Sequence, residues 1–227
     1  MSVIEGLAQG THSAYETFDT CPRMYQAKYI TKEVEFKQTP EAEYGDEVHN
    51  EFEAKLKQGG LPDTRFKSYW PLFKAVASQP GETIAEGKCA IDPHGAMVDY
   101  WDKEAYWLRG KVDVTVVDGS VAKVFDWKTG KKKQDNAQLR LYSLFTLARF
   151  PQVDKVLSGY VWLKSREITK PLVVTREEMG AVAEPFKRKG ELIARAQEVD
   201  HFPEKPSGLC NGWCDVTSCR FWKPKRR

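Results

Sequence analysis

The sequence lacks the long apolar segments of a membrane protein. No run among its 227 residues approaches the roughly 20 consecutive apolar residues that a membrane-spanning helix requires. The opening residues also lack the apolar core of a targeting sequence. We therefore expect a cytoplasmic protein that has no membrane partner.

A strong overall charge is also missing, as are internal repeats and low-complexity linkers. The 35 Lys and Arg residues nearly balance the 32 Asp and Glu residues, which gives a net charge of +3. Global charge therefore does not indicate a nucleic-acid partner. With 41% hydrophobic residues the chain can bury one sizeable core, and we expect a single domain over residues 1–227 that ends in a cysteine-rich tail at 206–227.

The five cysteines do not read as a disulfide framework in a chain of this expected compartment. Three of them, Cys210, Cys214 and Cys219, lie close together in the tail. Thiolates this close repel one another, and a soft metal centre explains them best. Cys89 lies within a strand-like run and is expected to be a small core residue.

The segment from Leu108 to Lys133 carries the strongest signal. Two runs rich in β-branched and aromatic residues flank Asp118-Gly119, a dipeptide that favours a hairpin turn. Alternation along the second run places Asp126 and Lys128 on one face and Trp127 on the other. The hairpin can bring Asp113 alongside them. Two carboxylates and an ammonium at one sheet surface indicate a site for a hard divalent cation acting on a phosphodiester.

The segment from Pro40 to Gln58 has helical spacing. Gly45, His49 and Glu53 are four residues apart and stack along one face, where the imidazole could complete the coordination of a cation. Glu53 could orient the ring or bind a water molecule. Glu86, in a strand expected over residues 83–91, is a further candidate ligand or water holder, although an exposed glutamate is nearly as well supported.

A second amphipathic helix is expected from Asp135 to Phe150, with Asp135 capping its first turn. Gln138 and Tyr142 lie one turn apart and can both reach the mouth of the hairpin. Two strands over residues 155–164 and 168–175 follow, and then a long helix over residues 177–199, which Pro185 should kink or restart. This order predicts an α/β sandwich with a mixed central sheet flanked by helices.

Taken in order, these motifs resemble the RecB-like branch of the PD-(D/E)XK nuclease superfamily. They read Gly45-x-x-x-His49, Glu86, Gly110-x-x-Asp113, Asp126-x-Lys128 and Gln138-x-x-x-Tyr142. The segment from Ser13 to Arg23 also resembles the opening helix of these nucleases, where an aromatic residue and then Cys-Pro-Arg recur. The match spans residues from about 10 to 145 and agrees in order, spacing and expected element type. It implies a restriction-endonuclease-like core.

The resemblance also implies a metal site. His49, Asp113, Asp126 and the backbone carbonyl of Trp127 would hold the cation, with Glu86 as an additional candidate. Mg²⁺ or Mn²⁺ is the implied ion, and the imidazole ligand should favour Mn²⁺ more than an all-oxygen site would.

The implied catalytic residues are Lys128, as the catalytic lysine, and Gln138 with Tyr142. The implied activity is a metal-dependent DNA nuclease, an exonuclease that acts on DNA ends or single strands in recombination or end processing. A phage-encoded protein of this kind would work in the host cytoplasm, with a recombination or annealing protein as a partner. Two alternatives stay open, namely a non-catalytic DNA-binding or adaptor protein that retains the fold, and a nuclease acting on RNA.

In these relatives a [4Fe-4S] cluster pins the C-terminal tail to the first helix. By resemblance its ligands here would be Cys21, Cys210, Cys214 and Cys219. The tail reads C-x3-C-x4-C rather than the common C-x2-C-x5-C, so the middle ligand is moved by one residue. Zinc at the same four sulfurs is the alternative, and free or core cysteines are the third interpretation.

A local run of positive charge follows the implied catalytic lysine. Lys131, Lys132 and Lys133 could neutralise backbone phosphates and give sequence-independent, salt-sensitive DNA binding. Such a run is also common on solvated turns.

Overall fold

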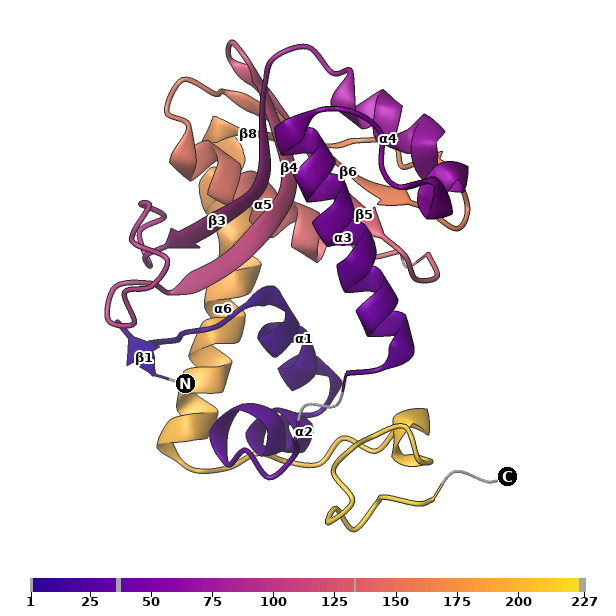
Figure 1. The fold of residues 1–227 in the computed structure, drawn as a ribbon. Coiled ribbons are helices and arrows are strands. Elements are labelled where there is room, and N and C mark those ends of the chain that lie inside the picture. The colour runs from indigo at the N-terminus through magenta and orange to yellow at the C-terminus, as the bar shows by residue number, and fades with distance from the viewer. Residues whose placement is uncertain (1, 36–37, 133, 225–227) are drawn as a thin grey trace.

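A mixed β-sheet forms the middle layer of the molecule (Figure 1). The computed structural model describes residues 2–35, 38–132 and 134–224. The sheet order is β3-β4-β5-β6-β7, and β8 pairs with β6 beside this path. The strands are β3 (Glu82–Ile91), β4 (Leu108–Asp118), β5 (Val121–Lys128), β6 (Lys155–Trp162), β7 (Glu167–Ile168) and β8 (Leu172–Thr175). Only β5 and β6 run parallel among these pairs, so the predicted mixed sheet is confirmed.

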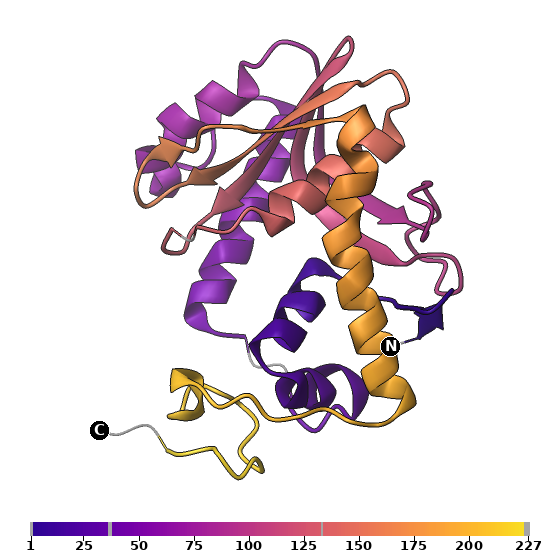
Figure 2. The ribbon, with the colours of Figure 1, turned by 180° about the vertical axis from the view of Figure 1, so that it is seen from behind.

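Helices cover both faces of this sheet. Figure 1 shows α3 and α4 in front of it, and Figure 2, from behind, shows α5 and α6 on the opposite face. The main helices are α1 (His12–Thr20), α2 (Pro22–Tyr25), α3 (Pro40–Gln58), α4 (Trp70–Ala77), α5 (Ala137–Arg149) and α6 (Met179–Glu198). A two-stranded ribbon of β1 (Val3–Ile4) and β2 (Leu7–Ala8) precedes α1. The predicted sandwich of a sheet flanked by helices is therefore confirmed, whereas α4 was not predicted.

The β4–β5 hairpin turns one residue later than the Asp118-Gly119 pattern suggests. Asp118 still pairs with Val121, and Gly119 and Ser120 form the loop. Gly119 has a φ of +60°, a conformation that glycine adopts without steric cost. The predicted hairpin is thus present, and Asp118 serves as its last paired residue.

An aromatic core lies between the sheet and the helices α3 and α4. Trp127 points to this side, where its ring centroid lies 4.9 Å from that of Phe52 and 6.4 Å from that of Phe73. Both phenylalanines are buried, as is Val48 one helical turn before Phe52. The alternation of β5 thus sends Trp127 into this core and leaves its two neighbours on the other side.

A second core lies under α5 and α6. Leu141, Leu144 and Phe145 of α5 are buried there, as the predicted apolar face requires. Helix α6 runs through Pro185 without a break, so the proline does not restart it. Within the described residues, none of the helices is both long and apolar enough to cross a membrane.

The C-terminal tail lies against α1 and α2 in both ribbon views (Figures 1 and 2). The Arg23 amide donates to the Pro203 carbonyl at 3.3 Å, and the Lys205 amide donates to Cys21 Sγ at 3.4 Å. Lys28 forms an ion pair with Asp215. These contacts join the last part of the described chain to its first helices.

Truncation of Phe52 tests the aromatic core. Its side chain is fully buried and contacts the rings of Trp127, Phe66 and Phe73. Phe52→Ala should lower the free energy of unfolding by about 3–5 kcal/mol, because it leaves a cavity. Urea denaturation measures this loss. Val173→Ala, at an exposed strand position, should cost less than about 0.5 kcal/mol, and an equally small loss for Phe52→Ala would contradict the packing described.

Candidate active site

Strands β4 and β5 separate at the residues that carry the predicted site. Their paired residues end at Val114 and Phe125. Beyond this point Asp113 Oδ2 accepts a hydrogen bond from the Trp127 amide at 2.9 Å. The carboxylate therefore takes the place of a backbone carbonyl in the ladder, and it holds the two strand ends at a fixed separation.

Asp126 and Lys128 meet on the face opposite to Trp127, as the alternation predicts. Lys128 Nζ lies 2.6 Å from Asp126 Oδ2, and the Asp126 side chain is almost fully buried. The ammonium also donates to Gln138 Oε1 at 2.9 Å. Gln138 Nε2 in turn donates to the Tyr142 hydroxyl at 2.7 Å. One chain of polar contacts thus joins the end of β5 to the first turns of α5.

Helix α3 brings His49 to this point. His49 Nδ1 lies 3.3 Å from Asp113 Oδ2, so Asp113 orients the ring. The suggested orienting role of Glu53 is not observed, because Glu53 forms an ion pair with Lys57 one turn further along. Gly45 lets α3 approach the end of β5, since a Cβ atom there would lie 3.3 Å from Thr129 Oγ1.

Glu86 lies on the neighbouring strand β3 and lines the same cavity. Its carboxylate pairs with Lys111 at 3.1 Å. Its backbone has a φ of +50°, and the β3–β4 pairing skips it between Ala85 and Gly87. Glutamate rarely adopts this conformation, so the surrounding sheet must hold it.

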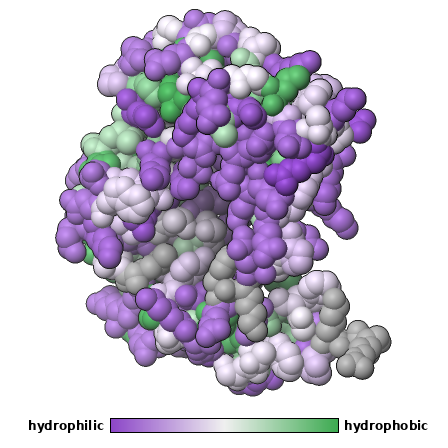
Figure 3. Space-filling view, viewed as in Figure 1, coloured by the Kyte–Doolittle hydropathy of each residue, from purple (hydrophilic) through white to green (hydrophobic). Residues whose placement is uncertain are grey.

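These residues share one cavity of about 860 Å³. Figure 3 shows that this face of the molecule is hollowed and mainly hydrophilic. Among the lining side chains are His49, Glu86, Asp113, Asp126, Lys128, Gln138 and Tyr142. The structure therefore brings together the predicted residues of the hairpin, α3, β3 and α5. The ligand role of the Trp127 carbonyl stays a prediction.

Burial and charge shift the pKa values of two of these groups. Burial, together with the nearby charge of Asp113, raises the pKa of Asp126 to about 7. Burial alone would lower the pKa of His49, but the hydrogen bond to Asp113 and the charges of Asp113 and Asp126 raise it above its usual value. Both residues therefore hold a proton more readily than their free side chains do, and a bound cation would compete with that proton.

The donor set suits a divalent cation. Asp126 Oδ2 is buried and has no hydrogen-bond partner of good geometry among the described residues, although Lys128 Nζ lies close to it. A cation would compete with Lys128 for this oxygen. His49 Nδ1, which lies 3.3 Å from Asp113 Oδ2, would be a neighbouring ligand atom.

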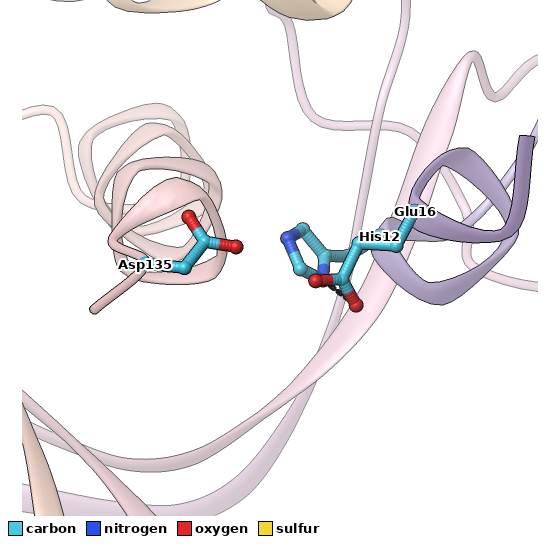
Figure 4. A group of neighbouring side chains, drawn as sticks. All are labelled: His12, Glu16 and Asp135. Atoms are coloured by element: carbon cyan, nitrogen blue, oxygen red, sulfur yellow. Dashed lines mark ion pairs between the residues drawn. The ribbon is translucent and has the colours of Figure 1, made fainter. Parts of the chain in front are cut away.

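A second group of possible metal ligands, which sequence analysis missed, lies at the edge of this cavity (Figure 4). Ligand atoms of His12, Glu16 and Asp135 all lie within 4.8 Å of one another, a spacing that could hold a metal ion. His12 Nδ1 is 3.4 Å from Glu16 Oε2, and burial lowers the pKa of His12, which favours the neutral imidazole. The spacing His12-x-x-x-Glu16 on a helix was the available signal. Asp135 was assigned only as a cap, and its Oδ1 does accept from the Ala137 amide at 2.8 Å.

The lysine run follows the end of β5. Lys131 lines a second cavity of about 370 Å³ that also contains Lys128 and Gln138. Lys132 pairs with Glu167, and Lys133 lies outside the described residues. The DNA-binding role of this run stays a prediction.

Four of the five cysteines line one small cavity between α1–α2 and the tail. They are Cys21, Cys210, Cys214 and Cys219. Burial raises the pKa of the Cys214 thiol, and nearby Cys21 and Cys210 add to the shift. Cys89 is instead buried in the core, as predicted.

Comparison with known proteins identifies the family of this chain. A sequence model of the PD-(D/E)XK nuclease superfamily matches residues 9–220. The gene 69 protein of Mycobacterium phage D29 is 34% identical over 160 residues, which cover 66% of this chain and 56% of that protein. The match thus spans little more than half of the phage protein's length.

A solved structure from Eubacterium rectale, described as a candidate exonuclease, has a TM-score of 0.55 and 13% sequence identity. The similarity covers 100% of this chain and 97% of that chain, and it shows a shared fold. The range matched by the family model includes the hairpin, the helices around the cavity and all four clustered cysteines. The chain belongs to the PD-(D/E)XK nuclease superfamily.

Proposed function

We propose that this nuclease is a divalent-metal-dependent deoxyribonuclease that degrades DNA from its ends or as single strands. The observation that carries this proposal is the cavity in which Asp113, Asp126 and His49 face Lys128. Nucleases of this superfamily generally use Mg²⁺ or Mn²⁺. The exonuclease activity, and its place in recombination or end processing, rest on the resemblance to the RecB-like branch.

Each residue has a role in this proposal. His49, Asp113 and Asp126 would hold the cation, with Glu86 and the Trp127 carbonyl as further candidates. When bound, the cation would lower the pKa of a water molecule and neutralise charge on the scissile phosphate. The residues themselves orient the phosphodiester in the cavity and place proton donors around it.

Lys128 is positioned from two sides, by Asp126 and by Gln138. As an ammonium it would stabilise the negative charge that develops on the phosphorane-like transition state and orient the attacking water. Gln138 keeps the ammonium in place through its carbonyl oxygen. Burial raises the pKa of Tyr142 well above its usual value, so its phenol stays protonated and can donate to a phosphate or a base edge. Lys131, Lys132 and Lys133 would bind the DNA backbone beside this centre.

We also propose that the four clustered cysteines hold a [4Fe-4S] cluster. Their convergence on one cavity supports a shared centre. A single tetrahedral zinc at the same four sulfurs is the alternative. We prefer the iron–sulfur cluster, which four cysteines also ligate, because the relatives that this chain resembles carry one between the tail and the first helix. Its role would be to fasten the tail to α1 and α2.

Substitution of the cavity residues tests the activity. Asp113→Asn, Asp126→Asn and Lys128→Ala should each lower the rate of DNA cleavage by at least about 100-fold, because each removes charge at the reacting phosphate. Linear duplex DNA, linear single strands, closed circular DNA and RNA are incubated separately with Mg²⁺, Mn²⁺ or EDTA. Linear DNA should be degraded with either metal and circular DNA should survive.

Asp118→Asn and Lys155→Ala are matched controls at exposed positions on the same sheet, and they should keep the wild-type rate. Rapid loss of circular DNA would contradict an exonuclease, and cleavage of RNA alone would contradict a deoxyribonuclease. Wild-type turnover by Lys128→Ala would show that its assigned role is wrong.

The raised pKa of Asp126 predicts a pH-dependent stability in EDTA. Between about pH 4 and pH 7 the folded carboxyl holds its proton while the unfolded one releases it, so stability falls as the pH rises. The wild-type thermal midpoint should therefore drop between pH 5 and pH 8 by several degrees more than that of Asp126→Asn. Added Mn²⁺ should restore the thermal midpoint of the wild type at pH 8, but not that of Asp126→Asn. Parallel pH profiles of the two proteins would contradict a raised pKa of Asp126.

Substitution of Cys214 tests the cluster. Anaerobically purified protein should be brown, with broad visible absorbance and about four irons per chain. Cys214→Ser should lose the colour and unfold at a lower temperature, because metal binding contributes to folding. Cys89→Ala, outside the cavity, should keep its iron. One zinc per chain in a colourless protein would identify a tetrathiolate zinc site. A metal-free protein whose thermal midpoint is unchanged by Cys214→Ser would contradict any metal centre at these cysteines.

A further inference from the structure

The loop between β3 and β4, residues 92–107, presents an exposed aromatic surface next to the active-site cavity. It lies at the left of Figure 1, above β1. Trp101 is 66% exposed, an unusual state for so large an apolar side chain. Its ring meets Tyr100 edge-on, with the centroids 5.0 Å apart, and Tyr100 lines the cavity that contains Asp126 and Lys128. The surface of Trp101 is thus linked to the cavity by a single neighbouring ring.

This loop is held firmly by the rest of the chain. The buried side chain of Gln9 donates to the carbonyls of Lys103 and Tyr106 at 2.8 and 2.6 Å. The Trp107 amide donates to Ile91 at the end of β3. An aromatic ring on a fixed loop can accept a flat ligand with little loss of conformational entropy.

Cationic groups surround the rings. Lys88 Nζ lies 4.8 Å from the centroid of the Trp101 ring. The Arg109 guanidinium contacts the rings of Tyr100 and Tyr106, at 5.2 and 4.5 Å from their centroids, and it donates to the Tyr100 carbonyl. Positive charge beside an aromatic face suits a ligand that carries both phosphates and flat rings.

The carboxylates of the loop contact its own backbone. Asp92, Asp99 and Asp102 accept hydrogen bonds from backbone amides within the loop and stabilise its turns. Glu86, at the cavity wall, is paired with Lys111. Glu104 is exposed to solvent. Lys88 and Arg109 are the charged side chains seen in contact with the rings, so positive charge lies directly at the aromatic faces.

We propose that Trp101, with Tyr100 and Lys88, forms a stacking platform for the bases of a single DNA strand that enters the cavity. This inference rests on the proposed function and narrows its substrate to DNA with an unpaired end. Stacking on an aromatic face needs a base whose own face is free, which a single strand provides along its length and a blunt duplex provides only at its terminal pairs. Because every base has such a face, the platform binds strands of any sequence.

Fluorescence anisotropy with labelled oligonucleotides in EDTA tests the platform without cleavage. The probes are a single strand of mixed sequence, the same length of abasic backbone, and a blunt duplex. Trp101→Ala should weaken binding of the single strand by roughly five- to 150-fold, the range expected for one stacked base. It should change binding of the abasic strand by less than about twofold, because that probe has no base to stack, and it should weaken binding of the blunt duplex less than that of the single strand, because only the terminal pairs expose a free face.

Two further variants separate stacking from folding. Trp101→Phe keeps a ring and should recover most of the affinity, whereas Leu192→Ala removes a similarly exposed side chain on α6 and should have no effect. Thermal melts check that all variants fold. An equal loss on the abasic strand, or no loss on the single strand, would overturn the platform. Failure of the platform alone would leave DNA cleavage by the wild type intact. A wild type that neither bound nor cleaved DNA would instead overturn the proposed function.

Discussion

The buried carboxylate of Asp126 is the constraint around which the rest of the site is arranged. A nearly inaccessible acid is costly unless a positive partner neutralises it. Lys128, two residues later on the same strand, is that partner, and Gln138 holds the lysine from the other side. Removing any member would leave a buried polar group without its counterpart, so these three side chains act as a unit.

Packing on the opposite side of β5 fixes the direction of these side chains. Trp127 lies between Asp126 and Lys128 in sequence and is packed against Phe52 and Phe73 in the aromatic core. Because strand side chains alternate, fixing the Trp127 ring also fixes the direction in which its neighbours project. Helix α3 serves both sides at once, since Phe52 packs on Trp127 while His49, almost one turn earlier, reaches Asp113.

Local patterns predicted much of this arrangement and failed where distant contacts decide. The alternation of β5, the helix over residues 40–58 and the partnership of Gln138 with Tyr142 all follow from short-range periodicity. The contact made by Glu53 did not follow from this periodicity, because Lys57 on the same helix competes for its carboxylate. The backbone of Glu86 is held in its unusual conformation by pairing with another strand, which no local pattern records.

The same limit explains the residues that were missed. His12 and Asp135 meet only because α1 and the start of α5 come together in the folded chain. Trp101 would be read as an ordinary loop residue without the Gln9 contacts that fasten its loop. Sequence spacing identifies which side chains share an element, and tertiary packing decides which elements share a cavity.

The parallel pairing of β5 with β6 has a consequence for how the protein is made. Parallel neighbours require a crossover, and here the crossover is α5, which carries Gln138 and Tyr142 back over the sheet. The contact of Lys128 with Gln138 therefore needs α5, and the contact of His49 with Asp113 joins this end of the sheet to a helix far upstream. A chain emerging from the ribosome would complete this set of contacts only after α5 has been made.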